Sequence, residues 1–300
     1  MESIVDERAE ADHGPRAKSA SGPWWRSQPS DGFARDRLFY FKYDLVWLCL
    51  FSVVVVAAHA TGWTGLGLTW TSLWAIPALL VACYIQVLAG VCVHNCTHGN
   101  FPRPINRLVG ETLGVIIGTR YASWEVLHKR HHAFTDDVEK DPHPNERSFW
   151  SFFIHKMVLG LETSIRAQSF ERFGDTPRMV KLDKFRTLFS FAVGMVMLAF
   201  WHALLGTVGF FYVFLPSLVV GAIHVSHFNW ATHRGWADDG DFRPVNLNHG
   251  LYKLGNFLCF GLYFHANHHA FPTYFDPSKL PAEKVARVER RLAAMAPNGA

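Results

Sequence analysis

The sequence predicts an all-α integral membrane protein, with four transmembrane helices in two hairpins beneath a cytoplasmic helical cap that holds a histidine-rich metal site. Two stretches, residues 45–102 and 187–233, contain no Asp, Glu, Lys or Arg. Charged residues make up only 18% of the chain, below the roughly 25% of soluble proteins. Most of the 17 histidines gather in a few short segments. Charge-free stretches this long are costly to expose to water, so a soluble pair of core helices is the weaker alternative.

The first charge-free stretch is long enough for two membrane helices, because one helix needs about 20 apolar residues to cross a bilayer. A natural break lies between Thr61 and Trp70, where two tryptophans and three glycines suit a turn at the membrane surface. This break predicts transmembrane helices near residues 44–60 and 72–93. The second stretch divides in the same way at a short turn near Gly206, which predicts helices near residues 187–205 and 208–227.

The rest of the chain is only partly apolar. Segments 105–124 and 149–166 are expected to form interfacial or re-entrant helices on the cytoplasmic face, and residues 281–295 have the spacing of a short amphipathic helix. The N-terminal segment is polar, without an apolar period or the hydrophobic core of a signal peptide. These features divide the chain into a disordered tail (1–36), a membrane domain (37–281) and a cytoplasmic amphipathic tail (282–300).

Lys and Arg are concentrated outside the two hairpin turns. Seven precede Tyr43, and others lie between the hairpins and after Arg234, whereas neither turn carries any. Basic residues favour the cytoplasmic side of membrane proteins, so both termini and the central segment are expected to be cytoplasmic. The net charge of +4 is too small and too dispersed to indicate a nucleic-acid-binding protein.

Three histidine clusters are the strongest functional signal in the chain, and the predicted topology places all of them on the cytoplasmic side. They are His94-x-x-x-His98, His128-x-x-His131-His132 and His265-x-x-His268-His269. On a helix, residues three or four apart share a face, whereas adjacent residues point roughly 100° apart. One His-x-x-His-His segment can therefore turn imidazoles towards two metals. The set indicates a two-metal site better than a single-ion site.

The ligand type narrows the choice of metal. Imidazole suits zinc, copper, iron and nickel. A structural zinc site needs four ligands and usually uses cysteine, but none of the five cysteines forms a Cys-x-x-Cys pair, and we expect them to be buried helix residues. Eight imidazoles shared by two metals give each metal four ligands, which leaves open positions for oxygen species on six-coordinate iron.

The order of these motifs resembles the membrane fatty acid desaturase superfamily. The resemblance runs from about residue 40 to residue 281, and the late motif His265-Ala-Asn-His-His-Ala-Phe-Pro272 is especially similar. The motifs are specific to the superfamily but not to a substrate, since desaturases, hydroxylases and ketolases share them. The resemblance implies a di-iron centre that uses O2 as co-substrate. Its implied iron ligands are His94, His98, His128, His131, His132, His265, His268 and His269.

Such enzymes often have one further histidine ligand near the cytoplasmic end of the last transmembrane helix. His227, in the segment His-Phe-Asn, matches that place best, and His224, His233 and His249 are alternatives. No catalytic residue is expected beyond the metal centre.

Other polar residues near the clusters have weaker roles in this interpretation. An acidic loop follows the second cluster, and a solvated loop is favoured over a set of carboxylates that orient ligand histidines. This loop contains Asp136, Asp137, Glu139 and Asp141. His143 is interpreted as part of a rigid turn and not as a ligand.

By the resemblance, the expected activity is O2-dependent desaturation of a fatty acyl chain or a similar aliphatic substrate, by a protein that lies in a lipid bilayer. A hydroxylase or ketolase, or a desaturase of a small secondary metabolite, are alternatives within the superfamily. A membrane zinc hydrolase or a metal-binding receptor or transporter is the alternative from a different class. A transporter should carry charged or metal-binding groups near the midplane of its spans, whereas here the histidine clusters lie at one end of the spans. The chain has no G-x-G-x-x-G motif and no visible redox domain, so a ferredoxin, rubredoxin or cytochrome b5-type donor is expected to dock on its basic cytoplasmic face.

Overall fold

The computed structural model describes residues 37–235 and 242–294, and within these ranges the chain is built from helices, turns and two isolated β-bridges. The predicted disordered tail lies outside the described residues. The elements in chain order are α1 (Phe39–Thr61), α2 (Ala75–Thr97), α3 (Arg103–Ile116), α4 (Tyr121–Phe134), α5 (Phe149–Ser151), η1 (Phe152–Val158), α6 (Gly160–Phe173), α7 (Pro177–Val208), η2 (Gly209–Phe214), α8 (Leu215–Thr232), α9 (Gly250–Leu258), α10 (His265–Ala270), η4 (Pro277–Lys279) and α11 (Ala282–Ala293). The all-α prediction is confirmed for these residues.

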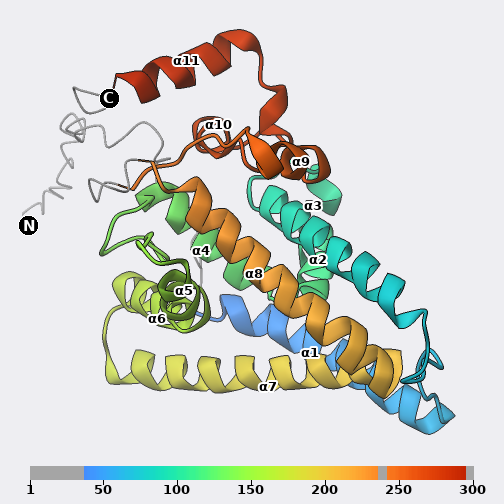
Figure 1. Ribbon diagram of the computed structural model, residues 1–300. Coiled ribbons are helices and arrows are strands. Elements are labelled where there is room, and N and C mark those ends of the chain that lie inside the picture. The colour runs from blue at the N-terminus through green and yellow to red at the C-terminus, as the bar shows by residue number, and fades with distance from the viewer. Residues whose placement is uncertain (1–36, 236–241, 295–300) are drawn as a thin grey trace, which may run out of the picture.

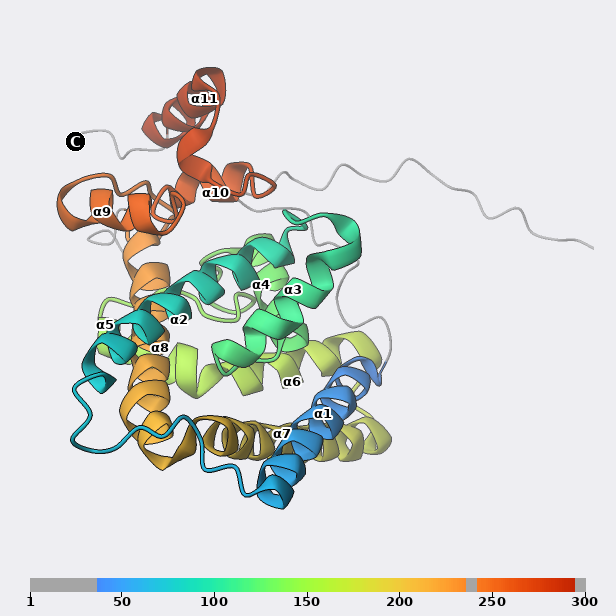
Figure 2. The same ribbon diagram turned by 90° about the vertical axis from the view of Figure 1, so that its right-hand side faces the viewer.

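Three helical segments of the described chain are long and apolar enough to cross a membrane. They are α1, α2 and a continuous segment of 56 residues, Pro177–Thr232, which contains α7, η2 and α8. Together they contain most of each of the four sequence stretches in which transmembrane helices were expected. The third segment is interrupted at Gly206, whose φ of 74° and ψ of 171° are not helical. This break coincides with the predicted turn, and α7 and α8 run in different directions on either side of it (Figures 1 and 2).

The long helices pack across the predicted hairpins more than within them. The extensive contacts of α1 are with α7, and those of α2 are with α3 and α8. The two predicted turns also meet: the backbone N–H of Leu66 donates to the carbonyl of Leu205 at 3.3 Å. A Cβ atom on Gly65 would collide with the backbone of Gly206, so the turns approach each other through glycine. Both turns therefore lie at one end of the bundle.

The shorter helices gather towards the other end of the bundle, in a region called the cap below (Figures 1 and 2). The segment predicted as 105–124 contains most of α3 and the start of α4, and the segment predicted as 149–166 contains α5, η1 and the first half of α6. Helix α11 matches the predicted amphipathic helix and stands away from the bundle (Figure 2). Helix α9 was not anticipated, and it exposes four large apolar side chains: Leu251, Leu254, Phe257 and Leu258.

Candidate metal centre

The histidines converge from four places in the fold. His94 and His98 lie at the C-terminal end of α2, and the second cluster lies on α4. The third cluster forms α10, a helix of only six residues, and His233 follows the last residue of α8. The ends of α2 and α8 thus meet α4 and α10 at the cap, which is why residues far apart in sequence share one site.

The imidazoles form two groups in which one nitrogen of each ring lies within 4.8 Å of a nitrogen of every other ring. The first group comprises His94, His98, His128, His132 and His268. The second group comprises His131, His233, His265 and His269. The groups adjoin, because the rings of His132 and His269 stack with centroids 4.2 Å apart. All eight predicted histidines are therefore brought together, with His233 added.

Close approaches of ring nitrogens occur inside both groups. The Nε2 atoms of His98 and His128 lie 2.8 Å apart, and those of His132 and His268 lie 3.0 Å apart. In the second group, Nε2 of His265 lies 2.9 Å from Nε2 of His233. Two neutral imidazoles whose Nε2 atoms face each other can share one proton, so only one of the two Nε2 lone pairs accepts a hydrogen bond. A metal ion, in contrast, accepts lone pairs from several rings at once.

Most imidazoles of the cluster are buried, and burial lowers the pKa of several of them, which favours their neutral form. His131 and His265 are each 1% exposed. Desolvation is the largest cause that lowers the pKa of both far below 6.5, followed by repulsion from neighbouring imidazoles. The same two causes hold the pKa of His128 well below its usual value. Neutral imidazole is the form that binds metals.

Several ring nitrogens in the cluster are buried without a hydrogen-bond partner in the described chain. They include both nitrogens of His94, Nε2 of His131, Nδ1 of His132 and Nδ1 of His265. A buried polar atom without a partner costs roughly 1–3 kcal/mol, so this many in one place is unfavourable unless a ligand satisfies some of them. The donor set fits a transition metal, because it consists of neutral imidazoles with open lone pairs.

Two carboxylates orient the second group, which corrects the interpretation of the acidic loop as solvated. Asp141 is 6% exposed, and its Oδ2 lies 2.9 Å from Nδ1 of His131. Asp136 places Oδ2 2.8 Å from Nδ1 of His233, and its backbone N–H donates to Asp141 at 2.6 Å. Glu139, in contrast, is exposed as expected. A carboxylate on the far nitrogen fixes the tautomer of a metal-ligand histidine and raises its basicity.

His143 lies closer to the cluster than the sequence indicated. Its ring is 4.4 Å from that of His131, and its backbone N–H donates to Asp141 at 3.0 Å. With His131 and Asp141 it forms a third set of potential ligand atoms. Burial, and then repulsion from His233, lowers the pKa of His143 to about 4.

The structure does not bring His227 to the cluster and places His233 there instead. His227 is half-buried, and its ring packs near Phe149 and Trp230, at 5.7 and 6.0 Å. His224 contacts the hydroxyl of Tyr263 at 3.3 Å, and the remaining alternative, His249, is exposed directly before α9. The reason lies in the end of the helix. The span was expected to end at residue 227, but α8 continues to Thr232, and the histidine at its end is His233.

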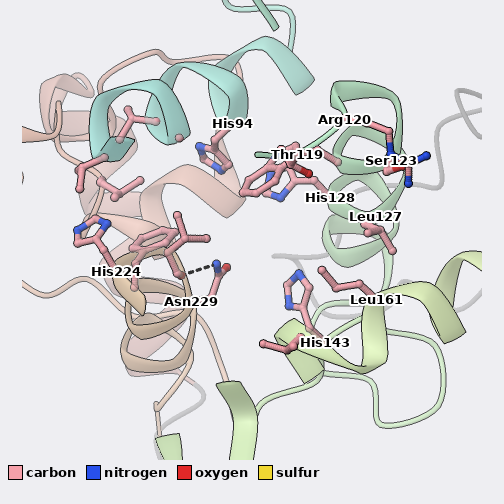
Figure 3. A pocket seen from close by; sticks show the side chains of 18 of the residues that line it. His94, Thr119, Arg120, Ser123, Leu127, His128, His143, Leu161, His224 and Asn229 are labelled. Atoms are coloured by element: carbon pink, nitrogen blue, oxygen red, sulfur yellow. Dashed lines mark hydrogen bonds between the residues drawn. The ribbon is translucent and has the colours of Figure 1, made fainter. Parts of the chain in front are cut away.

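An apolar cavity of about 250 Å³ reaches the first group at His94 and His128. Figure 3 shows these two rings beside the space, with His143 below them and His224 on the opposite wall. Apolar side chains of α2, α4, α6 and α8 line much of the remaining wall, including Val87, Val91, Leu127, Ile165 and Phe228. A largely apolar space beside imidazoles suits the oxidation of an apolar group, because exclusion of water protects reactive species.

Comparisons with known proteins agree with the motifs. A family model described as "Fatty acid desaturase" matches residues 68–300. The chain is 28% identical over 134 residues to the omega-6 fatty acid desaturase, endoplasmic reticulum isozyme 1, of Glycine max, a match that covers 42% of this chain and 33% of that protein. It is 34% identical over 124 residues to the Delta(12) fatty acid desaturase of Caenorhabditis elegans, covering 39% of this chain and 30% of that protein.

A third relative is the sn-1 stearoyl-lipid 9-desaturase of Synechocystis sp., which is 28% identical over 155 residues. That match covers 49% of this chain and 44% of the relative. The chain thus spans between about a third and under a half of the length of these curated relatives. No solved structure matches the chain.

Proposed function

Because the chain belongs to the fatty acid desaturase family, we propose that it is a membrane-bound di-iron oxidoreductase that uses O2 to introduce a double bond into an acyl chain. The observation that carries the proposal is the pair of adjoining, largely buried imidazole groups, the first of which reaches an apolar cavity. Family membership supports an oxidoreductase of the desaturase type, and the donor set suits iron.

In this proposal the first group of five histidines holds one iron and the second group of four holds the other, with His233 in the place first expected for His227. Two bound irons supply the redox chemistry that couples reduction of O2 to oxidation of two C–H bonds. The balance is one CH2–CH2 unit, one O2, two electrons and two protons, which give one CH=CH unit and two molecules of water. The electrons come from an external donor of the ferredoxin, rubredoxin or cytochrome b5 type.

The chain's own residues bind and orient the reactants. Asp141 and Asp136 hold His131 and His233 in one ring orientation. Val91, Leu127 and Phe228 exclude water from the space beside His94 and His128 and hold an aliphatic chain there. Positioning of this kind is worth much in catalysis, because a misplacement of about 1 Å can cost ~100-fold in rate.

The membrane topology completes the proposal. A straight helix of 56 residues would be about 84 Å long, far more than the ~30 Å hydrocarbon core. We therefore assign two crossings to Pro177–Thr232, with the break at Gly206 on the side away from the cytoplasm, which makes four spans in all. Both termini and the histidine cap face the cytoplasm, residues 37–281 form the membrane domain, and residues 1–36 and 282–300 are tails.

The test is the lipid content of cells that express the chain, compared with cells that express the His268→Ala variant. New double bonds that form only with the unsubstituted chain, and only in air, would support the proposal, together with about two irons per purified chain. Hydroxylated products in place of alkenes would assign a hydroxylase instead. Stoichiometric zinc without dependence on O2 would sink the oxidative proposal.

A further inference from the structure

Helix α9 carries an apolar face on the outside of the cap. Leu251 is 85% exposed and Phe257 is 82% exposed, and Leu254 and Leu258 complete the face. Since a helix turns by about 100° per residue, these four side chains lie within about 120° of one another around its axis. A concentrated apolar surface of this kind marks a contact with a protein partner or with a membrane.

The opposite side of α9 is fixed to the rest of the described chain. The ring of Tyr252 packs against that of Tyr263, with centroids 5.1 Å apart. A Cβ atom on Gly255 would lie 2.6 Å from the same Tyr263 ring, so helix and ring are in close contact. Asn256 is buried on this side as well. The helix therefore cannot rotate to bury its apolar face, which stays on the outside of the molecule.

The composition around α9 suits the surface region of a lipid bilayer. Between residues 244 and 264, Lys253 is the only residue among Asp, Glu, Lys and Arg. Lys253 is exposed at the rim of the apolar face, about 40° from Phe257 around the helix axis. Such a lysine lays its aliphatic stem along lipid and keeps its ammonium group in the headgroup region. Amphipathic helices of this kind bury their apolar face roughly 5–10 Å into the membrane surface.

A hydrogen bond brings the end of α9 to the apolar part of α2. The hydroxyl of Tyr84 donates to the backbone carbonyl of Leu258 at 3.2 Å. Tyr84 lies near the middle of α2, where Val81 and Ile85 are exposed at 58% and 45%. These side chains face lipid in the proposed topology, so the apolar face of α9 adjoins a surface that lipid covers. Figure 2 shows α9 projecting sideways beyond the end of α8.

The position of α9 also determines where the third histidine cluster begins. Oδ1 of Asn256 accepts from the backbone N–H of Tyr263 at 2.9 Å, and its carbonyl accepts from Gly261 at 2.8 Å. The N–H of Leu247, which precedes α9, donates to the carbonyl of Tyr263 at 2.9 Å. His265, the first residue of α10, follows only two residues after Tyr263. These hydrogen bonds transmit a displacement of α9 directly to α10.

We propose that α9 is embedded in the cytoplasmic leaflet of the bilayer and that this contact holds the third histidine cluster in position. Lipid acyl chains cover the apolar face, and the phosphates of lipid headgroups lie near Lys253. The helix anchors this part of the cap and does not cross the membrane, because nine residues span only ~14 Å of the ~30 Å hydrocarbon core. The contact is independent of the reaction that the site performs.

The first experiment places the photoreactive residue p-benzoylphenylalanine at position 257 of the full chain. The protein is reconstituted in vesicles of phosphatidylcholine that carries an alkyne at the end of one acyl chain, which makes cross-linked lipid detectable. The matched control carries the same residue at position 138, because Val138 is 85% exposed between two acidic residues of the cap. Illumination should cross-link lipid at position 257 and not at position 138.

The second experiment tests the link between α9 and α10. Phe257→Asp places a charge in the apolar face and leaves the protein-facing side of the helix unchanged. In the metal-free chain in vesicles, amide hydrogen exchange of residues 259–270 should become about tenfold faster, the factor that corresponds to ~1.4 kcal/mol of lost stabilisation. Val138→Asp adds the same charge elsewhere on the cap, and Phe257→Leu keeps the face apolar, so both should exchange as the unsubstituted chain does.

The outcomes separate this proposal from the proposed function. Equal lipid cross-linking at positions 257 and 138, or cross-links from position 257 to a second copy of the chain, would overturn the lipid contact. Unchanged exchange in Phe257→Asp would overturn the positioning of the third cluster. Lipid cross-links and faster exchange, in a chain that desaturates no acyl substrate, would support the role of α9 and count only against the proposed function.

Discussion

The imidazole of His131 lies against the carboxylate of Asp141, with Nδ1 2.9 Å from Oδ2, and both side chains are almost completely inaccessible to solvent. The other ring nitrogen, Nε2, has no partner in the described chain. The carboxylate therefore accepts the Nδ1 proton and leaves the Nε2 lone pair for a metal. One hydrogen bond thus determines which atom of His131 can act as a ligand.

Replacing Asp141 by Asn should weaken metal binding without removing a ligand. The amide of Asn is neutral and does not stabilise the Nδ1–H of His131 with a negative charge, so iron affinity or activity should fall by about 10–100-fold. The measurement is iron bound per folded chain at several free iron concentrations. Glu139→Gln is the control, since Glu139 is exposed in the same loop and should bind iron as the unsubstituted chain does. Equal iron affinity in the two variants would contradict the role of Asp141.

His233 and His227 provide a direct test of the ninth ligand. His233→Ala removes a ring whose Nε2 lies 2.9 Å from that of His265, so iron content and turnover should both fall strongly. His227→Ala removes a ring that packs on Phe149 and should keep nearly full iron content. Iron analysis and product per inserted chain distinguish them. The assignment is wrong if the two variants exchange these outcomes.

His268→Ala should abolish turnover and leave a folded membrane protein. His268 is 2% exposed and belongs to the first group, but it lies outside all the apolar segments, so membrane insertion does not require it. Helix content by circular dichroism and insertion by alkaline extraction should match the unsubstituted chain. His59 and His202 are exposed and far from the cluster, and Ala at either position should be nearly silent. Full activity of His268→Ala would show that this cluster is not catalytic.

The metal-free protein should become less stable in acid. Burial is the main cause that lowers the pKa of His143 to about 4 and that of His132 well below 6.5. The unfolded chain takes up these protons as the pH falls below 6.5, whereas the folded chain takes them up only below the lowered pKa values. The free energy of unfolding is therefore highest above pH 6.5. It falls as the pH is lowered towards about pH 4, by at most about 1.4 kcal/mol per pH unit for each of these histidines.

Thermal unfolding of chelator-treated protein in detergent provides the measurement. The midpoint should fall steadily between about pH 7 and about pH 5. Bound iron should reduce this dependence, because metal ligation holds the rings in the neutral form. A midpoint independent of pH in the metal-free protein would contradict the burial of neutral histidines.

The two glycine turns should face away from the cytoplasm, since neither carries Lys or Arg. Thr69→Cys and Thr207→Cys place a thiol on exposed residues of the two turns. Both should react with an impermeant maleimide added to intact cells, beyond the labelling of the native cysteines. Lys279→Cys, on an exposed side chain of the cap, should react only after the membrane is opened. Protection of either turn in intact cells would contradict the topology.

The sequence predicted the positions of the long helices well and their packing poorly. A charge-free stretch identifies an apolar helix, but a helix that is apolar on all sides has no stripe to show which neighbour it contacts. The contact of α1 with α7 depends on the fit of side chains such as Phe51 and Phe200, whose rings lie 5.0 Å apart. No periodicity in the sequence encodes that pairing.

The residues of the candidate site were also predicted only in part. Eight histidines were predictable because their spacings of three and four residues have a helical meaning. His233 was missed because the end of α8 was expected five residues too early. Asp136 and Asp141 were missed because acidic loops are usually solvated. Here a positive φ of 57° at Asp136 bends the loop, so that both carboxylates face inward.

The histidine groups also determine when the protein can mature. Their members begin with His94 on α2 and end with His269 on α10, so the set is complete only after every long apolar helix has left the ribosome. Chains emerge from the N-terminus first. In the proposed di-iron protein, metal would therefore be delivered only to chains whose long apolar helices have already been made.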